Sequence, residues 1–249
     1  MIGQALLEIM EENDKVVVLS SDVSVSVNTE RIHERYPERF FETGIAEQST
    51  VSVAGGLVME GFLPVYVALA IFSCEMTFAQ TRQVCNANLH VKIIGTHPGV
   101  DYGEDGSRHH ANEDLALARA IPRMTVLAPS DCHEVAAAIR EAVELDGPVY
   151  IRAARVPQPE IHEKGCKFEI AKAEVIYDQE DEFAILYEGS ALRQAMEGWK
   201  RTIPPLEDCT AAWPRSWREN IRKRWRFRSA LQMCLPNLGK KRTSKRNMA

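Results

Sequence analysis

The feature that most constrains the fold of this chain is the apolar run Val16-Val17-Val18-Leu19 near its beginning. A strand with one face in water alternates apolar and polar residues, whereas an uninterrupted apolar run is typical of a strand buried on both faces of a parallel sheet. We therefore predict a buried strand from Lys15 to Ser20. It leads into a polar loop that begins at Ser21-Asp22.

Further strands of this kind alternate with helical patterns along the chain. We predict strands over residues 40–43, 65–70, 91–95, 124–128 and 149–152. We predict helices over residues 4–12, 30–39 (with a turn at Pro37), from Glu47 onward, 75–89, a helix ending near 120 that Asn112 or Asp114 would cap, and 131–145. This alternation predicts an α/β fold, a mainly parallel sheet with helices on both faces. In such sheets ligands bind at the carboxyl ends of the strands.

The stretch from Arg39 to Gly61 is the most unusual segment within this pattern. A short strand turns at Gly44 and enters a helix that is nearly free of charge, with one acid, Glu47, in its first turn. Apolar and small residues continue at helical spacing, so we expect burial on several sides: Thr50, Val53, Ala54 and Leu57. The pair Gly55-Gly56 costs about 1 kcal/mol per glycine in a helix interior, which suggests that another segment packs very close.

Two interpretations of Glu47 remain open from the residues alone. An acid in the first turn of a helix is favoured by the helix dipole, by under about 1 kcal/mol, and that is the commoner role. The alternative is a desolvated acid held for proton chemistry.

A long loop follows the predicted strand 91–95. Glycines at three positions permit tight backbone, while His97, Asp105, His109 and His110 supply polar and titratable groups. Loops of this length are commonly functional or disordered. A metal site is one alternative, although the spacing matches no common zinc pattern. A surface loop with solvated histidines is the other, and it explains the glycines poorly.

Composition divides the chain into two parts. Residues 198–249 hold 14 Lys or Arg against 3 Asp or Glu, a net charge of +11, together with all four tryptophans. Residues 1–197 hold 16 Lys or Arg against 32 Asp or Glu, a net charge of −16.

Six scattered cysteines indicate reduced thiols in a cytoplasmic protein, and the beginning of the chain does not look like a signal peptide. The apolar stretch 62–72 is too short for a membrane span of about 20 residues.

These patterns suggest four segments. We expect an α/β domain over residues 1–156 and a linker over 157–182. Residues 183–190 read as a strand and turn and 191–197 as a helix, which would be the start of an incomplete carboxyl-terminal domain. Residues 198–249 show no sustained apolar period, so we expect a basic tail that is disordered or is an aberrant ending such as a shifted reading frame.

Several ordered motifs between Val16 and Arg155 resemble one family. They are Gly44-Ile45-Ala46-Glu47-Gln48, Phe72 with Phe78-Ala79-Gln80-Thr81-Arg82, Gly95-Thr96-His97, Gly103-Glu104-Asp105-Gly106-Ser107-Arg108-His109, and Arg119-Ala120-Ile121-Pro122. The chain is similar to the pyrimidine-binding domain of thiamine-diphosphate enzymes of the transketolase type. Its nearest resemblance is to the carboxyl-terminal subunit of a split transketolase, in a truncated form.

The resemblance implies a set of site residues. In this family a glutamate bonded to N1′ of the aminopyrimidine favours the imino tautomer, whose 4′-nitrogen removes the thiazolium C2 proton. A phenylalanine stacks on the pyrimidine ring, and two histidines handle protons of the sugar. The matched positions are catalytic Glu47, His97 and His109, cofactor-binding Glu47, Phe72 and Asp22, and substrate-binding Ser26, His97, Asp105 and Arg155.

The resemblance also implies cofactors and partners. The reaction would be transfer of a two-carbon ketol unit between sugar phosphates, with thiamine diphosphate and Mg²⁺ or Ca²⁺. The chain lacks the family's Gly-Asp-Gly…Asn segment. We therefore expect no metal ligands here, a diphosphate-binding partner subunit in a heterotetramer, and self-association of the isolated chain.

Rival functions come from two classes. Within the superfamily, 1-deoxyxylulose-5-phosphate synthase and the beta-type subunit of 2-oxo acid dehydrogenases remain open, although the Gly-Glu-Asp-Gly…His loop favours transketolase. Outside it, the chain would be an inactive fragment, or a nucleic-acid-binding protein that uses its basic tail.

Overall fold

A computed structural model describes residues 1–100, 103, 106–176 and 184–202 of the chain, with the side chains described as far as residue 199. The chain divides into two compact units, and the larger comprises Met1–Gln179 and Ile185–Trp199. All the structural features below belong to this larger unit, apart from residue 184 and the last turn of one helix. Two predicted features, Asp105 and the tail from residue 203 onward, lie outside the described residues.

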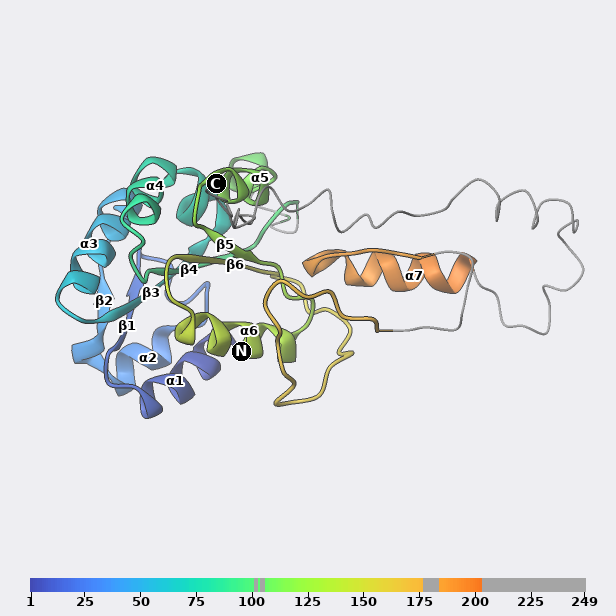
Figure 1. The fold of residues 1–249 in the computed structure, drawn as a ribbon, viewed down its shortest axis with the longest axis horizontal. Helices are drawn as coiled ribbons and strands as arrows, with labels where there is room; N and C mark the ends of the chain where they lie inside the picture. Colours follow the sequence, from blue (N-terminus) through green and yellow to red (C-terminus); the bar gives the residue numbers. More distant parts are fainter. Residues whose placement is uncertain (101–102, 104–105, 177–183, 203–249) are drawn as a thin grey trace, which may run out of the picture. The chain divides into compact units, whose positions relative to one another are not determined.

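The larger unit is built on one parallel sheet (Figure 1). Its six strands are β1 (Val16–Ser20), β2 (Phe40–Glu42), β3 (Leu63–Leu69), β4 (Lys92–Thr96), β5 (Thr125–Leu127) and β6 (Val149–Ala153). They are ordered β2-β1-β3-β4-β6-β5, and every neighbouring pair is parallel. The predicted α/β fold is confirmed. Leu69 pairs with Thr96 and Thr96 with Ala153, so three carboxyl ends finish level with one another.

Helices cover both faces of the sheet, as Figure 1 shows. One layer holds α1 (Ile2–Glu12), α2 (Glu30–Arg35) and α6 (Cys132–Glu144), and the other holds α3 (Glu47–Met59), α4 (Phe78–Asn86) and α5 (Asp114–Ala120). Successive strand residues point to opposite faces. Val16 and Val18 therefore pack beneath the α1 layer, while Val17 and Leu19 pack against the α3 layer. This two-sided burial is why β1 carries no polar residue before Ser20.

Helix α6 illustrates how local sequence sets an element. The Asp131 carboxylate caps the helix by accepting hydrogen bonds from the backbone N–H groups of His133 and Glu134, at 3.0 and 2.9 Å. Such a cap contributes about 1 kcal/mol. The predicted apolar stripe of Val135, Ile139 and Val143 is buried in the core.

The helix predicted over residues 75–89 differs from the structure. The chain forms a π-helical turn over Ile71–Glu75, in which Met76 N–H donates to the carbonyl of Ile71, and α4 begins only at Phe78. The Thr77 hydroxyl donates to the carbonyl of Ser73 at 2.5 Å, immediately before α4 begins. Periodicity could not reveal this turn because it keeps the backbone helical while changing its register.

The predicted caps of α5 are not used. Glu113 occupies the position before this helix and makes no side-chain cap, while Asp114 is its first residue and directs its carboxylate toward β6. A side chain engaged by the sheet cannot also cap its own helix.

The region after β6 also departs from expectation. Residues 184–188, the described part of the strand predicted over 183–190, form no strand, and a short 3₁₀ turn at Gly189–Ala191 follows. The predicted helix 191–197 is observed as α7 (Leu192–Thr202). Gly189 N–H donates to the carbonyl of Ala128 and the Arg193 guanidinium donates to the carbonyl of Pro157. These contacts attach the segment to the domain without adding a strand to the sheet.

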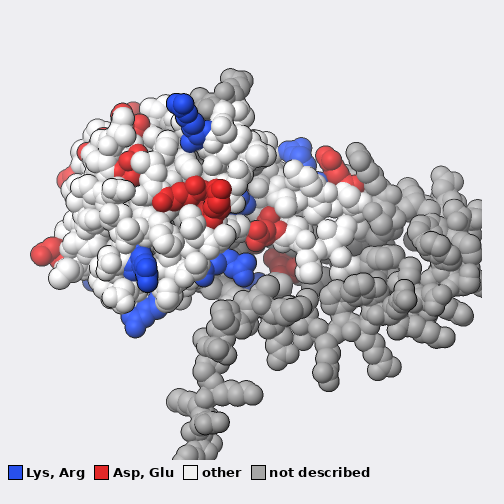
Figure 2. Space-filling view, turned by 90° about the horizontal axis from the view of Figure 1, so that it is seen from above, with Lys and Arg blue, Asp and Glu red and all other residues white. Residues whose placement is uncertain are grey.

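The described surface carries charges of both signs. On the face in Figure 2, Lys and Arg residues and Asp and Glu residues form small separate groups amid a largely uncharged surface.

Among the described residues, no helix is both long and apolar enough to span a bilayer. The four described cysteines are unpaired thiols, in agreement with the prediction for those positions: Cys74, Cys85, Cys132 and Cys166.

Candidate functional site

Five of the predicted site residues lie along the carboxyl edge of the sheet. Each follows the end of a strand or begins the helix after it: Asp22 after β1, Glu47 after β2, Phe72 after β3, His97 after β4 and Arg155 after β6. Because the strands are all parallel, these ends share one edge. The expected location of the site is therefore consistent with the topology.

Glu47 is the first residue of α3 and is 7% exposed. Among the described residues, nothing forms a hydrogen bond with its carboxylate. Both sequence interpretations therefore meet in one residue, since the acid stands in the first turn and is also largely desolvated. Buried carboxylates normally have hydrogen-bond partners within the protein. An acid with none is available to a group from outside the chain.

A cluster of hydroxyl groups lies beside the start of α3. The Ser21 hydroxyl is 3.0 Å from the Thr50 hydroxyl and 3.1 Å from that of Tyr66. The hydroxyl groups of Thr43 and Thr50 are 2.6 Å apart. Burial raises the pKa of Tyr66 far above its usual range, and the charge of Glu47 adds to this. The cluster joins β1, β2, α3 and β3, so it fixes the position from which Glu47 projects. Sequence reasoning missed it because single Ser and Thr residues carry no spacing signal.

Asp22 lies in the loop after β1, with a left-handed backbone at φ = 58°. Its backbone N–H donates to the Glu42 carboxylate at 2.6 Å, and the N–H of Gly44 approaches the same oxygen at 3.3 Å. Glu42 thereby ties the loop after β1 to the turn that precedes Glu47. Asp22 itself is exposed, so its carboxylate is accessible from solvent.

Phe72 lies in the π-helical turn, half-buried, and its ring contacts the ring of His109 edge-on. The ring centroids are 5.7 Å apart and the planes meet at 77°. His109 belongs to a short 3₁₀ turn, Ser107–His109, of the long loop. The structure therefore brings together two predicted site residues that are distant in the sequence.

A cavity of about 400 Å³ brings three further predicted residues together, namely Ser26, His97 and Arg155. His97 has a left-handed backbone at φ = 57°, and its Nδ1 lies 2.8 Å from the Thr96 hydroxyl. Strained backbone of this kind is concentrated at functional sites in proteins. The first turn of α1 contributes Ile2 to the wall, so the beginning of the chain helps to close the cavity.

A buried polar group at the start of α5 was not anticipated. Asp114 is fully buried, and its Oδ2 accepts hydrogen bonds from the Tyr150 hydroxyl at 2.8 Å and from Arg152 Nε at 3.0 Å. A side chain at Gly95 would place its Cβ 2.3 Å from the Tyr150 hydroxyl. The close approach of the Tyr150 ring therefore requires glycine at position 95. A glycine within a buried strand was the one sequence signal that could have indicated this close packing.

A second acidic residue near the same edge has an altered ionisation. Burial, and then the charge of Glu113, raise the pKa of Glu75 to about 7. Glu75 ends the π-helical turn that carries Phe72. This carboxyl was not among the predicted site residues.

The outer side of α3 differs from the expectation of burial on several sides. Thr50, Val51 and Ala54 are buried against the sheet, whereas Val53 is 45% exposed. Gly55 is explained within the chain, because a Cβ there would lie 3.3 Å from the Leu89 side chain, but Gly56 faces open space. Further exposed apolar residues flank this side, namely Ile45 and Met59. Part of the surface of α3 is therefore left uncovered by the described residues.

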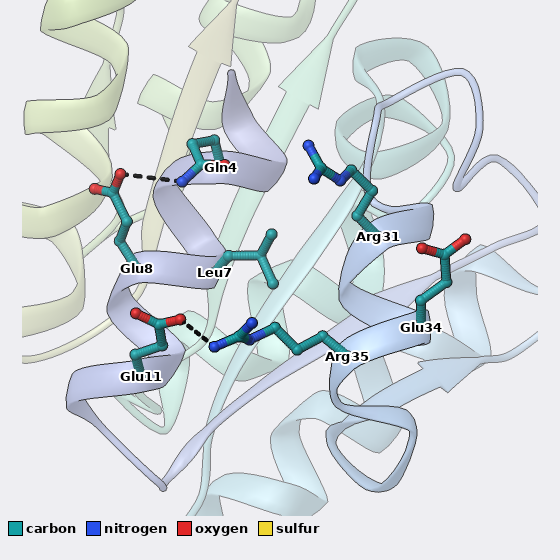
Figure 3. Close-up of a pocket in the computed structure, with 7 residues that line it drawn as sticks. All are labelled: Gln4, Leu7, Glu8, Glu11, Arg31, Glu34 and Arg35. Carbon is teal, nitrogen blue, oxygen red and sulfur yellow. Dashed lines mark hydrogen bonds and ion pairs between the residues drawn. The ribbon is translucent and has the colours of Figure 1, made fainter.

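A second cavity, of about 360 Å³, lies between α1 and α2 (Figure 3). Its lining holds acids and arginines together, including the Glu11–Arg35 ion pair at 2.6 Å. None of the predicted site residues lines it. Exposed pairs of this kind contribute little to stability or binding, so this groove is not the candidate site.

Comparison with known families and proteins decides the assignment. Residues 1–157 match the family described as the pyrimidine binding domain of transketolase. The chain belongs to the transketolase family. It is 36% identical, over 197 residues, to a protein of Methanocaldococcus jannaschii described as a transketolase C-terminal section, a match that covers 78% of this chain and 62% of that protein. It is 32% identical to a 6-deoxy-6-sulfo-D-fructose transketolase subunit of a Clostridium species, covering 77% and 59%.

Solved structures agree with this assignment to the transketolase family. A split-gene transketolase, described as an inactive beta4 tetramer, superimposes with a TM-score of 0.65 and 39% identity over 72% of this chain and 58% of that one. A transketolase from Campylobacter jejuni shares the fold, with a TM-score of 0.58 and 23% identity, over 65% and 26% of the two chains. The chain thus spans about 60% of the length of the split-type relatives that it matches. The predicted resemblance is confirmed.

Proposed function

We propose that this chain is the pyrimidine-side subunit of a two-chain transketolase, which transfers a two-carbon ketol unit between sugar phosphates. The observation that carries the proposal is Glu47, a residue that is 7% exposed and whose carboxylate has no hydrogen-bond partner among the described residues. It stands at the carboxyl edge of the sheet, in the part of the chain that matches the family. The family membership supplies the chemistry that such an acid would serve.

The residues around Glu47 fit thiamine diphosphate. This cofactor supplies the carbanion chemistry, while the protein binds and orients it. Glu47 would hold a proton between its carboxylate and N1′ of the aminopyrimidine, which satisfies the orphaned acid. Phe72 would provide an apolar ring for the pyrimidine, and Asp22 lies in the adjoining loop. We expect a partner chain to supply the ligands of Mg²⁺ or Ca²⁺.

The cavity beside His97 fits a sugar with an anionic end. Arg155 contributes a guanidinium, which suits a phosphate because its N–H groups match two oxygens at once. Ser26 would add a hydroxyl, and His97 and His109 would handle protons of the sugar's hydroxyl and carbonyl groups. A sulfonate has similar geometry, so the relative named for a sulfosugar suggests a second substrate class to test. The role of Asp105 stays a prediction.

The exposed side of α3 fits a protein partner. Ile45, Val53 and Met59 are exposed there, and Gly56 offers a surface without a side chain, so another backbone can approach closely. Obligate interfaces are large and hydrophobic. The similar split-gene structure is a tetramer of one chain type and is described as inactive. We therefore expect the isolated chain to self-associate without activity and the partner to restore it in a heterotetramer.

Two measurements test the proposal. Calorimetry should find weak thiamine-diphosphate binding by the purified chain, and much tighter, metal-dependent binding when a subunit carrying the Gly-Asp-Gly…Asn motif is added. A coupled assay should find ketol transfer only in the mixture, with sugar phosphates and sugar sulfonates compared as donors. Tight, metal-dependent cofactor binding by the chain alone would refute the two-chain proposal.

A matched pair of variants tests the substrate side. In the assembled enzyme, His109→Ala should lower turnover, and His97→Ala should mainly raise the donor concentration required. Arg140→Ala, which removes the partly exposed ion pairs of α6 with Glu8 and Glu12 of α1, serves as the control. Loss of cofactor affinity in both histidine variants, with unchanged substrate kinetics, would contradict these roles.

A further inference from the structure

A histidine and two glutamates converge at a place that the proposed reaction does not use. Glu134 lies in the first turn of α6, and His162 and Glu174 lie in the segment that follows β6. Each offers one ligand atom, and the three atoms all lie within 4.8 Å of one another. The segment lies beyond residue 157, where the match to the family's pyrimidine-binding domain ends.

His162 is held in a fixed orientation by a buried carboxylate. Its side chain is 7% exposed, and its Nδ1 lies 2.9 Å from Oδ2 of Asp131, whose side chain is fully buried. The same oxygen accepts hydrogen bonds from the backbone N–H groups of Ile161 and His162, at 2.8 and 2.9 Å. The other ring nitrogen, Nε2, points toward the Glu174 carboxylate at 3.2 Å.

This arrangement has the chemistry of a zinc ligand set. A histidine that binds a metal through one ring nitrogen usually donates its other N–H to a carboxylate, which fixes the tautomer and the ring plane. Asp131 does this for His162. Imidazole nitrogen and carboxylate oxygen are both ordinary ligands of Zn²⁺, and three protein ligands with one water complete a tetrahedral site. The carboxylates of Glu134 and Glu174 balance the charge of the ion.

We propose that the chain binds one divalent transition-metal ion, Zn²⁺ foremost, through His162 Nε2 and one carboxylate oxygen each from Glu134 and Glu174. The ion fastens the segment after β6 to the first turn of α6, because two ligands come from the segment and one from the helix. Its effect is structural, and it is independent of thiamine diphosphate and of a partner subunit.

A neighbouring group of side chains offers a different ligand set. Cys132 Sγ lies 3.5 Å from the Glu160 carboxylate, and His133 Nε2 lies 3.7 Å from it. Glu160 is 67% exposed and His133 is 27% exposed, so this group is less rigidly held than His162. A softer thiolate in the set would give a different spectroscopic signature, which the experiment uses.

The experiment titrates the chelator-treated full chain with Zn²⁺ in a calorimeter and follows its thermal unfolding. We expect binding of one ion per chain, a raised Tm, and slower proteolysis of residues 157–176. Glu174→Gln alters an exposed residue that cannot unfold the domain, and it should weaken binding at least tenfold, as should His162→Gln. Glu169→Gln, in the same segment and ion-paired with Lys172, is the matched control and should bind like the unaltered chain.

Cobalt distinguishes the two ligand sets. Co²⁺ bound through nitrogen and oxygen should show tetrahedral visible bands without a sulfur-to-cobalt charge-transfer band, and Cys132→Ser should leave its affinity unchanged. A sulfur charge-transfer band that Cys132→Ser abolishes would overturn the proposal in favour of the neighbouring group. Absence of zinc binding, or binding that both His162→Gln and Glu174→Gln leave intact, would overturn it outright.

Discussion

Glu47 and Asp114 are both acids in the first position of a helix, both are buried, and both lie near the carboxyl edge of one sheet. They differ in what surrounds them. The Oδ2 of Asp114 accepts hydrogen bonds from the Tyr150 hydroxyl and from Arg152 Nε, although its Oδ1 has no partner among the described residues, whereas neither oxygen of Glu47 has one. The chain thus pairs one buried acid with a cation and a hydroxyl at one of its two oxygens, and gives the other acid no hydrogen-bond partner among the described residues.

We propose that this difference separates a structural acid, Asp114, from a functional one, Glu47. A buried charge without a partner costs free energy, and proteins retain such a cost mainly where function needs the group. Removing the compensated acid should therefore harm the fold, while neutralising the uncompensated one should harm only the reaction. The following changes test that contrast, from the largest expected effect to the smallest.

Neutralising Glu47 should have the largest effect. In the assembled two-subunit enzyme, Glu47→Gln should lower turnover by about 10²- to 10⁴-fold, because an amide cannot take part in the proton transfer. The free energy of unfolding of the isolated chain should stay the same or rise, since a desolvated charge is removed without loss of a hydrogen bond. Coupled ketol-transfer rates and denaturant unfolding measure the two quantities. Near-normal turnover in the variant would show that Glu47 is only a helix-start acid.

Removing Asp114 should reverse this pattern. Asp114→Ala leaves the Arg152 guanidinium, which is 14% exposed, without its anion, and should lower the free energy of unfolding by about 3–5 kcal/mol. Asp114→Asn keeps an acceptor for Tyr150 and should cost less. Urea unfolding monitored by circular dichroism measures both. If Asp114→Ala unfolded like the unaltered chain, the proposed division between the two acids would fail.

Gly95→Ala disturbs the same network without touching a charge. The added methyl group would lie 2.3 Å from the Tyr150 hydroxyl unless the ring moves, so we expect a loss of about 1–3 kcal/mol. Gly56→Ala is the control, because nothing lies within 4 Å of its Cβ position, and it should be neutral or slightly stabilising in the isolated chain. A thermal-unfolding comparison in which Gly95→Ala behaved like Gly56→Ala would contradict the described packing.

Glu75 provides the test with the smallest expected effect, a gradual change of stability with pH. Its pKa is raised to about 7 in the folded chain, mainly by burial, from 4.5 in the unfolded chain. Between these values the folded state binds more protons, so stability from this group is greatest at low pH and is lost as pH rises to about 7. Solvent screens the half-buried group, so the change should be under about 1 kcal/mol. Glu75→Gln should remove this part of the stability-versus-pH curve, and an unchanged curve would argue against the raised pKa.

The parts of the fold that follow from local pattern could be predicted from the sequence. The unbroken apolar run of β1 predicts a strand with helices on both sides, and the stripe Val135-Ile139-Val143 predicts the face of α6 that is buried. The placement of Glu47 and His97 at strand ends followed from the same reading. One cavity is lined by Ser26, His97 and Arg155, and the substrate-binding role that the family resemblance implied for them stays a prediction.

The remaining features depend on contacts between residues that are distant in the chain. Asp114 looked like a helix cap because its partners on β6 are 36 and 38 residues away. The hydroxyl cluster beside Glu47 joins four elements. The π-helical turn that carries Phe72 keeps the backbone helical, so the spacing of apolar residues did not distinguish it from an α-helix. Val53 was expected to be buried because its residue type is apolar, yet apolarity cannot show whether the covering surface belongs to this chain or to another.

The sheet has a short strand at each edge, and this has a consequence for preparing the protein. β2 and β5 are three residues each, so their outer sides offer few unpaired backbone N–H and C=O groups to another chain. Long, flat edges promote runaway strand addition, whereas short ones resist it. When the chain is expressed without a partner, its association should therefore proceed through side chains and stop at discrete, dissociable oligomers. Such material should sediment as defined species, remain unable to seed fibrils, and be recoverable by dilution.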